Sequence, residues 1–247
     1  GTTWKLREGI VDNSPSITGG SYYPGGLRVE VDENGAPLKQ RLGNTVPTTT
    51  GGFGFDGRVG NFDFNVFFNY SLGNKIVNGT KLANAFYHGS AKNYNLVNDF
   101  ALGSRYTWID PETGLNHGRP STSTIAAYGG ADAMIARLNE INSGASIYNP
   151  AGVSTMQLID YAVEDASFLR VQNITVGYTL PKKWMKSIFL DSVRIYFTGY
   201  NLFCFTGYDG YDPEVDTSSK KNPMCPGIDY AAYPKSRTFV GGINVTF

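Results

Sequence analysis

Large apolar and polar residues alternate along residues 62–72. One set of alternate positions holds Phe, Phe, Val, Phe, Tyr and Leu, and the other holds Asp, Asn, Phe, Asn and Ser. A period of two residues is typical of a β-strand with one apolar and one polar face. The run of 11 residues also matches the length that a tilted strand needs to cross a bilayer, about 9–11 residues.

In a membrane barrel, the two faces of such a strand would have different surroundings. We then expect the apolar side chains to face lipid, namely Phe62, Phe64, Val66, Phe68 and Tyr70. The polar side chains would face a hydrated interior, namely Asp63, Asn65, Asn69 and Ser71.

The end of the chain shows the same alternation. Its apolar face consists of Phe239, Gly241, Ile243, Val245 and Phe247. A terminal strand needs neighbours on both edges, and a closed barrel supplies them. With shorter alternating segments near 174–180 and 193–197, the pattern predicts about six strands. They lie near residues 2–11, 48–57, 62–77, 167–180, 192–206 and 237–247.

The connections between these strands are unequal in length. Short ones at 57–61 and 181–191 alternate with long ones at 13–47, 78–166 and 207–236. Bacterial outer-membrane barrels have short periplasmic turns and long external loops, whereas a compact soluble domain seldom carries a connection as long as 78–166. The sequence therefore predicts an all-β fold. We expect the chain to form about six strands of a large antiparallel transmembrane β-barrel with long extracellular loops.

The long connection 78–166 contains one helical pattern. Within Ala131–Ser143, apolar residues recur at helical spacing as Met134, Ile135, Leu138 and Ile141. Asp132 lies near the start of this segment and Gly144 lies just past its end, as is typical of helix termini. We predict a short amphipathic helix here.

Composition excludes several classes of protein. The 247 residues carry 21 Lys and Arg against 21 Asp and Glu, so no basic field exists for nucleic acid. Charged residues make up only 17%, below the roughly 25% of an average soluble domain. No apolar run approaches the ~18 residues of a membrane helix. The chain begins at Gly1 without a charged and apolar leader, so we expect a removed leader or a piece of a longer chain.

The cysteines and histidines give little indication of a metal or cofactor. Two unpaired thiols are favoured for Cys204 and Cys225, although a single bridge between them stays open. With two histidines and no Cys-x-x-Cys, a zinc site is not expected, and neither is a cofactor.

Several motifs occur in order along the second half of the chain. Residues 166–184 read ASFLRVQNITVGYTLPKKW, residues 200–203 read YNLF, and residues 207–214 read GYDGYDPE. These motifs, with the closing strand at 237–247, resemble SusC/RagA-type TonB-dependent transporters. The match covers most of 42–77 and nearly all of 165–247, and only loosely the stretch 78–165.

The resemblance implies a function and a set of partners. Such transporters are outer-membrane barrels with an N-terminal plug that import glycans or peptides. They pair with a SusD-like surface lipoprotein and draw energy from TonB. This chain would then be the C-terminal part of the barrel, with the plug and TonB box absent from it and the remainder of the barrel upstream. Its location would be the outer membrane of a Gram-negative, Bacteroidetes-like bacterium. Phe247 resembles the terminal signal that the barrel-assembly machinery reads.

One departure concerns a possible calcium loop. Family members often carry an Asp-x-Asn-Gly-Asp-Gly run in the first of these loops, whereas here Asp32 is followed by Glu-Asn-Gly-Ala. A calcium loop needs further oxygen ligands. We therefore favour a plain Asn-Gly turn here, with a metal at Asp32 and Asn34 as the open alternative.

Candidate substrate-binding residues lie in the long loops, because aromatic faces stack on sugars and carboxylates bind their hydroxyl groups. The candidates are Tyr94, Tyr106, Trp108, Asp110 and Tyr128, with Tyr208, Asp209 and Tyr211 in the last loop. A structural role is favoured for 207–214, because the motif is common to the family while substrates differ. Trp184, after Lys182 and Lys183, is expected at the periplasmic rim.

Catalysis is not expected, and neither is nucleic-acid binding. Carboxylates cluster at 160–165 and 209–212, but proximity along a loop is not the facing geometry of a glycosidase, and no Ser/His/Asp arrangement appears. We expect an importer, with glycan oligosaccharides favoured over oligopeptides as substrate. The alternative is a soluble carbohydrate-binding β-sandwich.

Overall fold

The structure is a computed structural model that describes most of the chain. The described residues are 25–26, 33–34, 38–86, 95–116, 121–152, 158–185, 190–217 and 226–247. They fall into two compact units. Leu42–Gly79 and Val163–Phe247 form the strand unit, and Gly1–Arg41 and Thr80–Ala162 form the loop unit. The strand expected near 2–11 lies outside the described residues, as do Asp32, Tyr94 and Cys225.

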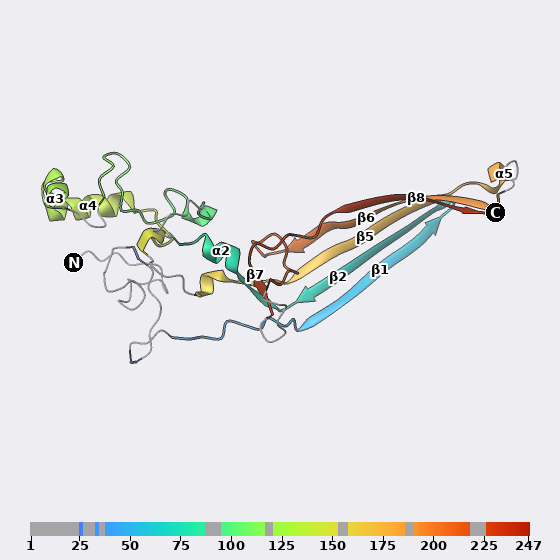
Figure 1. Ribbon diagram of the computed structural model, residues 1–247, viewed down its shortest axis with the longest axis horizontal. Coiled ribbons are helices and arrows are strands. Elements are labelled where there is room, and N and C mark those ends of the chain that lie inside the picture. The colour runs from blue at the N-terminus through green and yellow to red at the C-terminus, as the bar shows by residue number, and fades with distance from the viewer. Residues whose placement is uncertain are drawn as a thin grey trace. The chain divides into compact units, whose positions relative to one another are not determined.

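The strand unit contains a five-stranded antiparallel sheet in the order β1-β2-β5-β6-β8. Its strands are β1 (Thr49–Val59), β2 (Phe62–Leu72), β5 (Phe168–Thr179), β6 (Ser192–Thr206) and β8 (Thr238–Thr246). They run alongside one another in Figure 1. At about 3.3 Å per residue these strands reach roughly 30–50 Å, enough to cross a bilayer even when tilted.

The observed strands lie close to the ranges that the alternation predicts, with one interruption. The segment expected at 62–77 breaks at Gly73, whose φ of +80° favours glycine over other residues. The chain continues as β3 (Lys75–Asn78) in a second, three-stranded sheet in the order β4-β3-β7. Here β4 (Val163–Asp165) pairs antiparallel to β3, and β7 (Ile228–Asp229) pairs parallel to it.

The pairing register of the five-stranded sheet collects apolar residues on one face. Phe64 of β2 lies opposite Val176 of β5, which lies opposite Phe197 of β6. The same face includes Phe53, Phe55, Phe62, Phe203, Phe205, Phe239 and Ile243. These side chains remain exposed: even on the central strand, Val176 is 47% exposed. We call this the apolar face.

The opposite, polar face is held together by side-chain interactions that cross strands. Arg194 of β6 reaches over Gly177 to Asp63 of β2, with 2.9 Å between Nε and Oδ1 and 2.5 Å between the second nitrogen and Oδ2. Asn173 donates a hydrogen bond to Asn65 at 2.8 Å. In the row of Asn65, the hydroxyl groups of Thr175 and Thr198 lie 2.9 Å apart. Several polar residues thus bind one another across the sheet.

A bulge in β5 keeps apolar residues on one side. Val171 lies opposite Phe68 and Asn173 lies opposite Phe67, so Gln172 is an extra residue without a partner in β2. An extra residue shifts the alternation by one position. The apolar face of β5 therefore uses even-numbered positions from 174 onward but odd-numbered positions at 169 and 171.

The loop unit contains short helices. Helix α2 (Gly79–Ala83) begins at the last residue of the first segment of the strand unit. The α-helices that follow are α3 (Thr122–Ala127) and α4 (Ala131–Ile141). The 3-10 turns are η1 (Asn98–Phe100), η2 (Pro150–Gly152) and η3 (Asp160–Ala162). The helix predicted within 131–143 is confirmed as α4, with Met134 and Leu138 buried. Among the described residues, no helix is both long enough and apolar enough to span a membrane.

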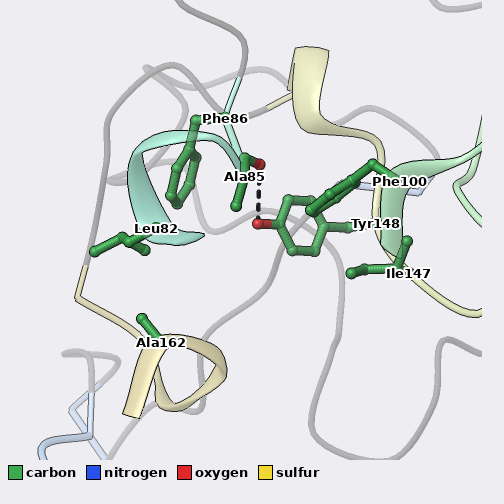
Figure 2. Packing of buried hydrophobic residues seen from close by; sticks show 7 residues of the cluster. All are labelled: Leu82, Ala85, Phe86, Phe100, Ile147, Tyr148 and Ala162. Atoms are coloured by element: carbon green, nitrogen blue, oxygen red, sulfur yellow. Dashed lines mark hydrogen bonds between the residues drawn. The ribbon is translucent and has the colours of Figure 1, made fainter. Parts of the chain in front are cut away.

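The loop unit also has a hydrophobic core of its own. The cluster consists of Leu82, Ala85, Phe86, Phe100, Ile147, Tyr148 and Ala162. At its centre the ring of Phe100 packs edge-on against Tyr148 with 5.1 Å between centroids (Figure 2). The hydroxyl group of Tyr148 donates a hydrogen bond to the carbonyl oxygen of Ala85 at 3.1 Å. The long connection is thus a folded unit, not an extended loop.

The predicted all-β class needs one correction. The described chain is mostly β, but it carries the short helices of the loop unit and α5 (Lys182–Met185) in the short connection between β5 and β6. In Figure 1, α5 and the C-terminal end of β8 lie at the same end of the sheet. Period-two alternation finds strands only, so it does not report a four-residue helical turn.

Candidate functional site

The loop unit holds four of the described candidate residues, and their surroundings differ. Tyr106 is only 1% exposed, and its backbone N–H donates to the carbonyl oxygen of Ile147 at 2.9 Å. Burial raises the pKa of the Tyr106 phenol well above its usual value. This position favours a packing role for Tyr106. Trp108 is half-buried.

Asp110 is a buried carboxylate with a full set of partners. Arg137 of α4 binds it with two nitrogens, at 2.9 Å to Oδ2 and 3.2 Å to Oδ1. The backbone N–H of Glu112 donates to Oδ1 at 2.9 Å. The hydrogen bond from Arg137 is the main reason that the pKa of Asp110 lies well below its usual value.

Tyr128 joins the same cluster, so two residues singled out from the sequence lie side by side. Its hydroxyl group donates to Oδ2 of Asp110 at 2.9 Å and lies 2.8 Å from Oγ1 of Thr113. Arg137 also pairs with Glu112 and Glu140, both at 2.9 Å. Because these groups bind one another, the arrangement ties the turn at 110–113 to α4. Arg137 was not foreseen, since nothing in its spacing along the chain points to Asp110.

In the strand unit, the candidates of the last loop also separate by burial. Tyr208 is buried, and its hydroxyl group donates to Oδ2 of Asp229 at 2.6 Å. Burial, followed by this hydrogen bond, raises the pKa of the Tyr208 phenol. Asp209 is exposed, and its backbone N–H donates to Glu164 at 3.0 Å. Tyr211 is 80% exposed.

An ion-pair network with a buried centre connects the last loop to β5. Arg170 of β5 donates to Oδ1 of Asp212 at 2.6 Å, and both side chains are almost fully buried. Glu214 lies 3.3 Å from Nε of Arg170 and 2.5 Å from Nζ of Lys235, and the backbone N–H of Lys235 donates to Asp212 at 3.1 Å. We call these four residues the loop latch. Its geometry agrees with the structural role expected for 207–214.

A cavity of about 390 Å³ lies between the last loop and the polar face. Its lining includes Thr50, Asn69, Ser71 and Phe168 from the sheet and Glu214, Val215 and Asp216 from the loop. Sequence reasoning did not identify it, because its walls come from segments about 150 residues apart.

No metal centre is evident in the part of the chain that the structure describes. There, no group of three or more His, Cys, Asp or Glu residues could hold a metal ion. Cys204 lies half-buried in β6 as a free thiol.

Known proteins provide a further comparison. No protein-family model matches the chain. TonB-dependent receptor P3 of Formosa agariphila is 29% identical over 242 residues, covering 96% of this chain and 20% of that receptor. TonB-dependent receptor SusC of Bacteroides thetaiotaomicron is 37% identical over 89 residues, covering 36% of this chain and 8% of SusC. The resemblance to SusC-type TonB-dependent receptors is confirmed. The chain spans about a fifth of the length of receptor P3.

Solved structures show the same resemblance at the level of the fold. The RagAB peptide transporter matches with a TM-score of 0.57 and 22% identity, over 92% of this chain and 21% of that chain. The RagAB peptide importer in its open-open state matches with a TM-score of 0.51 and 21% identity, over 92% of this chain and 20% of that chain. These relatives are receptors and transporters, in agreement with the expectation that the chain is not an enzyme.

The Asp110 cluster makes a testable prediction about the loop unit. Replacing Arg137 by Gln leaves a buried carboxylate without its main partner, so amide hydrogen exchange at 106–142 should accelerate about tenfold or more at neutral pH. Because the pKa of Asp110 is lowered on folding, the stabilisation is present above its ordinary value of 3.8 and is lost as the pH falls below it.

Glu140→Gln is the matched control, since it removes an exposed partner of the same arginine. Equal exchange rates in Arg137→Gln and Glu140→Gln would show that the buried pair does not stabilise the loop unit.

Proposed function

We propose that this chain forms part of the wall and the external loops of a TonB-dependent nutrient importer in the outer membrane of a Gram-negative, Bacteroidetes-like bacterium. One observation carries the proposal. A sheet of long strands leaves its apolar face exposed, while its polar face is cross-linked by ion pairs and hydrogen bonds. Hydrocarbon on one side and a hydrated interior on the other would account for both faces.

The competing soluble β-sandwich fits this observation less well. A sandwich buries the apolar faces of two sheets against each other. Here Val176 and Phe197 remain about half exposed, and among the described residues no second sheet covers them.

The two edges of the sheet support a closed barrel. β1 and β8 each pair with one neighbour in the described part of the chain, so each has one row of open backbone groups. In the proposed barrel, strands from the remainder of the same barrel pair with these edges. The plug and the TonB box belong to that remainder, and through them TonB supplies the energy for import.

The short connections would lie on the periplasmic side. Trp184 in α5 is exposed next to Lys182 and Lys183, a combination that suits a membrane interface. The long connections would be external. There they would meet substrate and a SusD-like surface lipoprotein.

A lysine on each face of the sheet tests the wall directly. Val176→Lys on the apolar face should destabilise the protein in the membrane by about 2–4 kcal/mol, because it places a charge in hydrocarbon. Val240→Lys makes the same substitution on the polar face, where Val240 lies opposite Thr198, and should cost about 0.5 kcal/mol or less. Thermal unfolding in lipid nanodiscs measures both.

In water the difference would vanish, because Val176→Lys and Val240→Lys would then both replace a partly exposed apolar group by a charge. A Val176→Lys protein as stable as the Val240→Lys protein would count against the membrane wall.

Phe247 is proposed as the assembly signal. It follows β8 and is 89% exposed, so its loss removes little packing within the chain. Deleting Phe247 should lower the amount of protein in the outer-membrane fraction, measured by heat-modifiable gel migration, while Phe247→Tyr, which keeps an aromatic terminus, should assemble normally. Unchanged assembly of the deletion would contradict the role.

Glycan oligosaccharides are proposed as the first substrate class and oligopeptides as the second. Aromatic loops suit either class, and the RagAB peptide transporter shares the fold. Cells that lack the gene should take up labelled oligosaccharides more slowly and labelled oligopeptides at the normal rate. The opposite pattern would assign the protein to peptide import.

A further inference from the structure

We propose that the cavity between the last loop and the polar face binds a neutral sugar unit. The inference rests on the proposed function and adds to it a binding site and a ligand class. At about 390 Å³ the cavity falls within the roughly 300–1,000 Å³ that small-molecule sites occupy.

The floor of the cavity is the polar face near the ends of β1, β2 and β5. Thr50 lies opposite Ser71, which lies opposite Phe168, so these three side chains share one row on that face. Asn69 belongs to the next row. The floor thus combines hydroxyl and amide groups with an aromatic side chain. These groups complement a sugar, whose hydroxyl groups form hydrogen bonds and whose C–H faces pack on aromatic side chains.

The loop wall supplies carboxylate oxygens whose charge is partly compensated. Glu214 lines the cavity and is paired with Arg170 and Lys235, neither of which lines the cavity itself. A carboxylate oxygen keeps several acceptor sites, so a paired Glu214 can still accept a hydroxyl hydrogen bond. Asp216 adds a second carboxylate to the same wall.

The described lining offers no cationic group to an anionic ligand. Among the described lining residues there are two carboxylates and no Lys or Arg. A uronate or a sulfated sugar would therefore find no cationic side chain in the lining to pair with its negative charge. A neutral ring needs no such partner.

Asn69 provides an unused hydrogen-bonding group in the cavity wall. Its amide oxygen is buried and has no hydrogen-bond partner within the described part of the chain. An unsatisfied buried acceptor is costly, and the terminal torsion of an Asn side chain turns easily. A hydroxyl donor in the cavity would therefore relieve that cost.

The loop latch keeps the cavity preformed. The ion pair between Arg170 and Asp212 fixes the chain just before Glu214. A site that is already ordered loses less entropy on binding, so weak polar contacts suffice for useful affinity.

Filling the cavity tests the inference. Thr50→Trp places a large side chain at an exposed position of its floor, and Thr238→Trp makes the same change on the polar face of β8, outside the cavity. Binding is measured by calorimetry on the full-length protein in detergent. The probes are neutral hexasaccharides of glucan, mannan, galactan and xylan, a hexagalacturonate and an uncharged hexapeptide.

We expect at least one neutral hexasaccharide to bind, Thr50→Trp to weaken it tenfold or more, and Thr238→Trp to leave it within twofold. The inference is overturned if no neutral sugar binds, if Thr50→Trp leaves its affinity unchanged, or if the galacturonate or peptide is the probe that Thr50→Trp displaces. None of these results affects the membrane wall, which the lysine pair at Val176 and Val240 tests separately.

Discussion

The apolar face of the five-stranded sheet must be kept out of water, and the rest of the strand unit is consistent with that constraint. Each exposed phenylalanine or valine on it represents apolar area that water solvates unfavourably, at about 25 cal/mol per Å². Small soluble domains avoid contiguous apolar patches of more than a few hundred Å². In hydrocarbon the same surface has no such cost, and an apolar surface is what that surrounding favours.

The polar face shows the complementary behaviour. Its charges and amides bind one another across strands, as Arg194 does with Asp63 and Asn173 with Asn65. Such a face needs little from its surroundings beyond water. The loop latch extends the same principle to the end of the sheet where β5 begins, and there a buried arginine holds the last loop against β5.

Much of this arrangement can be predicted from the sequence, because the alternation of apolar and polar residues along a strand is a local property. Period two locates β2, β5, β6 and β8, and helical spacing locates α4. The break at Gly73 and the bulge at Gln172 were not foreseen, since both depend on pairing between strands. Burial was the least predictable feature. Tyr106 and Tyr208 read like ligand-stacking tyrosines, yet both are buried, because partners distant in the chain, Ile147 and Asp229, contact them.

Gly177 makes room for the ion pair between Arg194 and Asp63. A Cβ at this position would lie 2.4 Å from a guanidinium nitrogen of Arg194 and 2.6 Å from a carboxylate oxygen of Asp63. The space above Gly177 therefore lets the Arg194 side chain of β6 cross β5 and bind Asp63 of β2. Any larger residue at position 177 would displace Arg194 or Asp63, so the ion pair that couples β2 and β6 across β5 requires a glycine there.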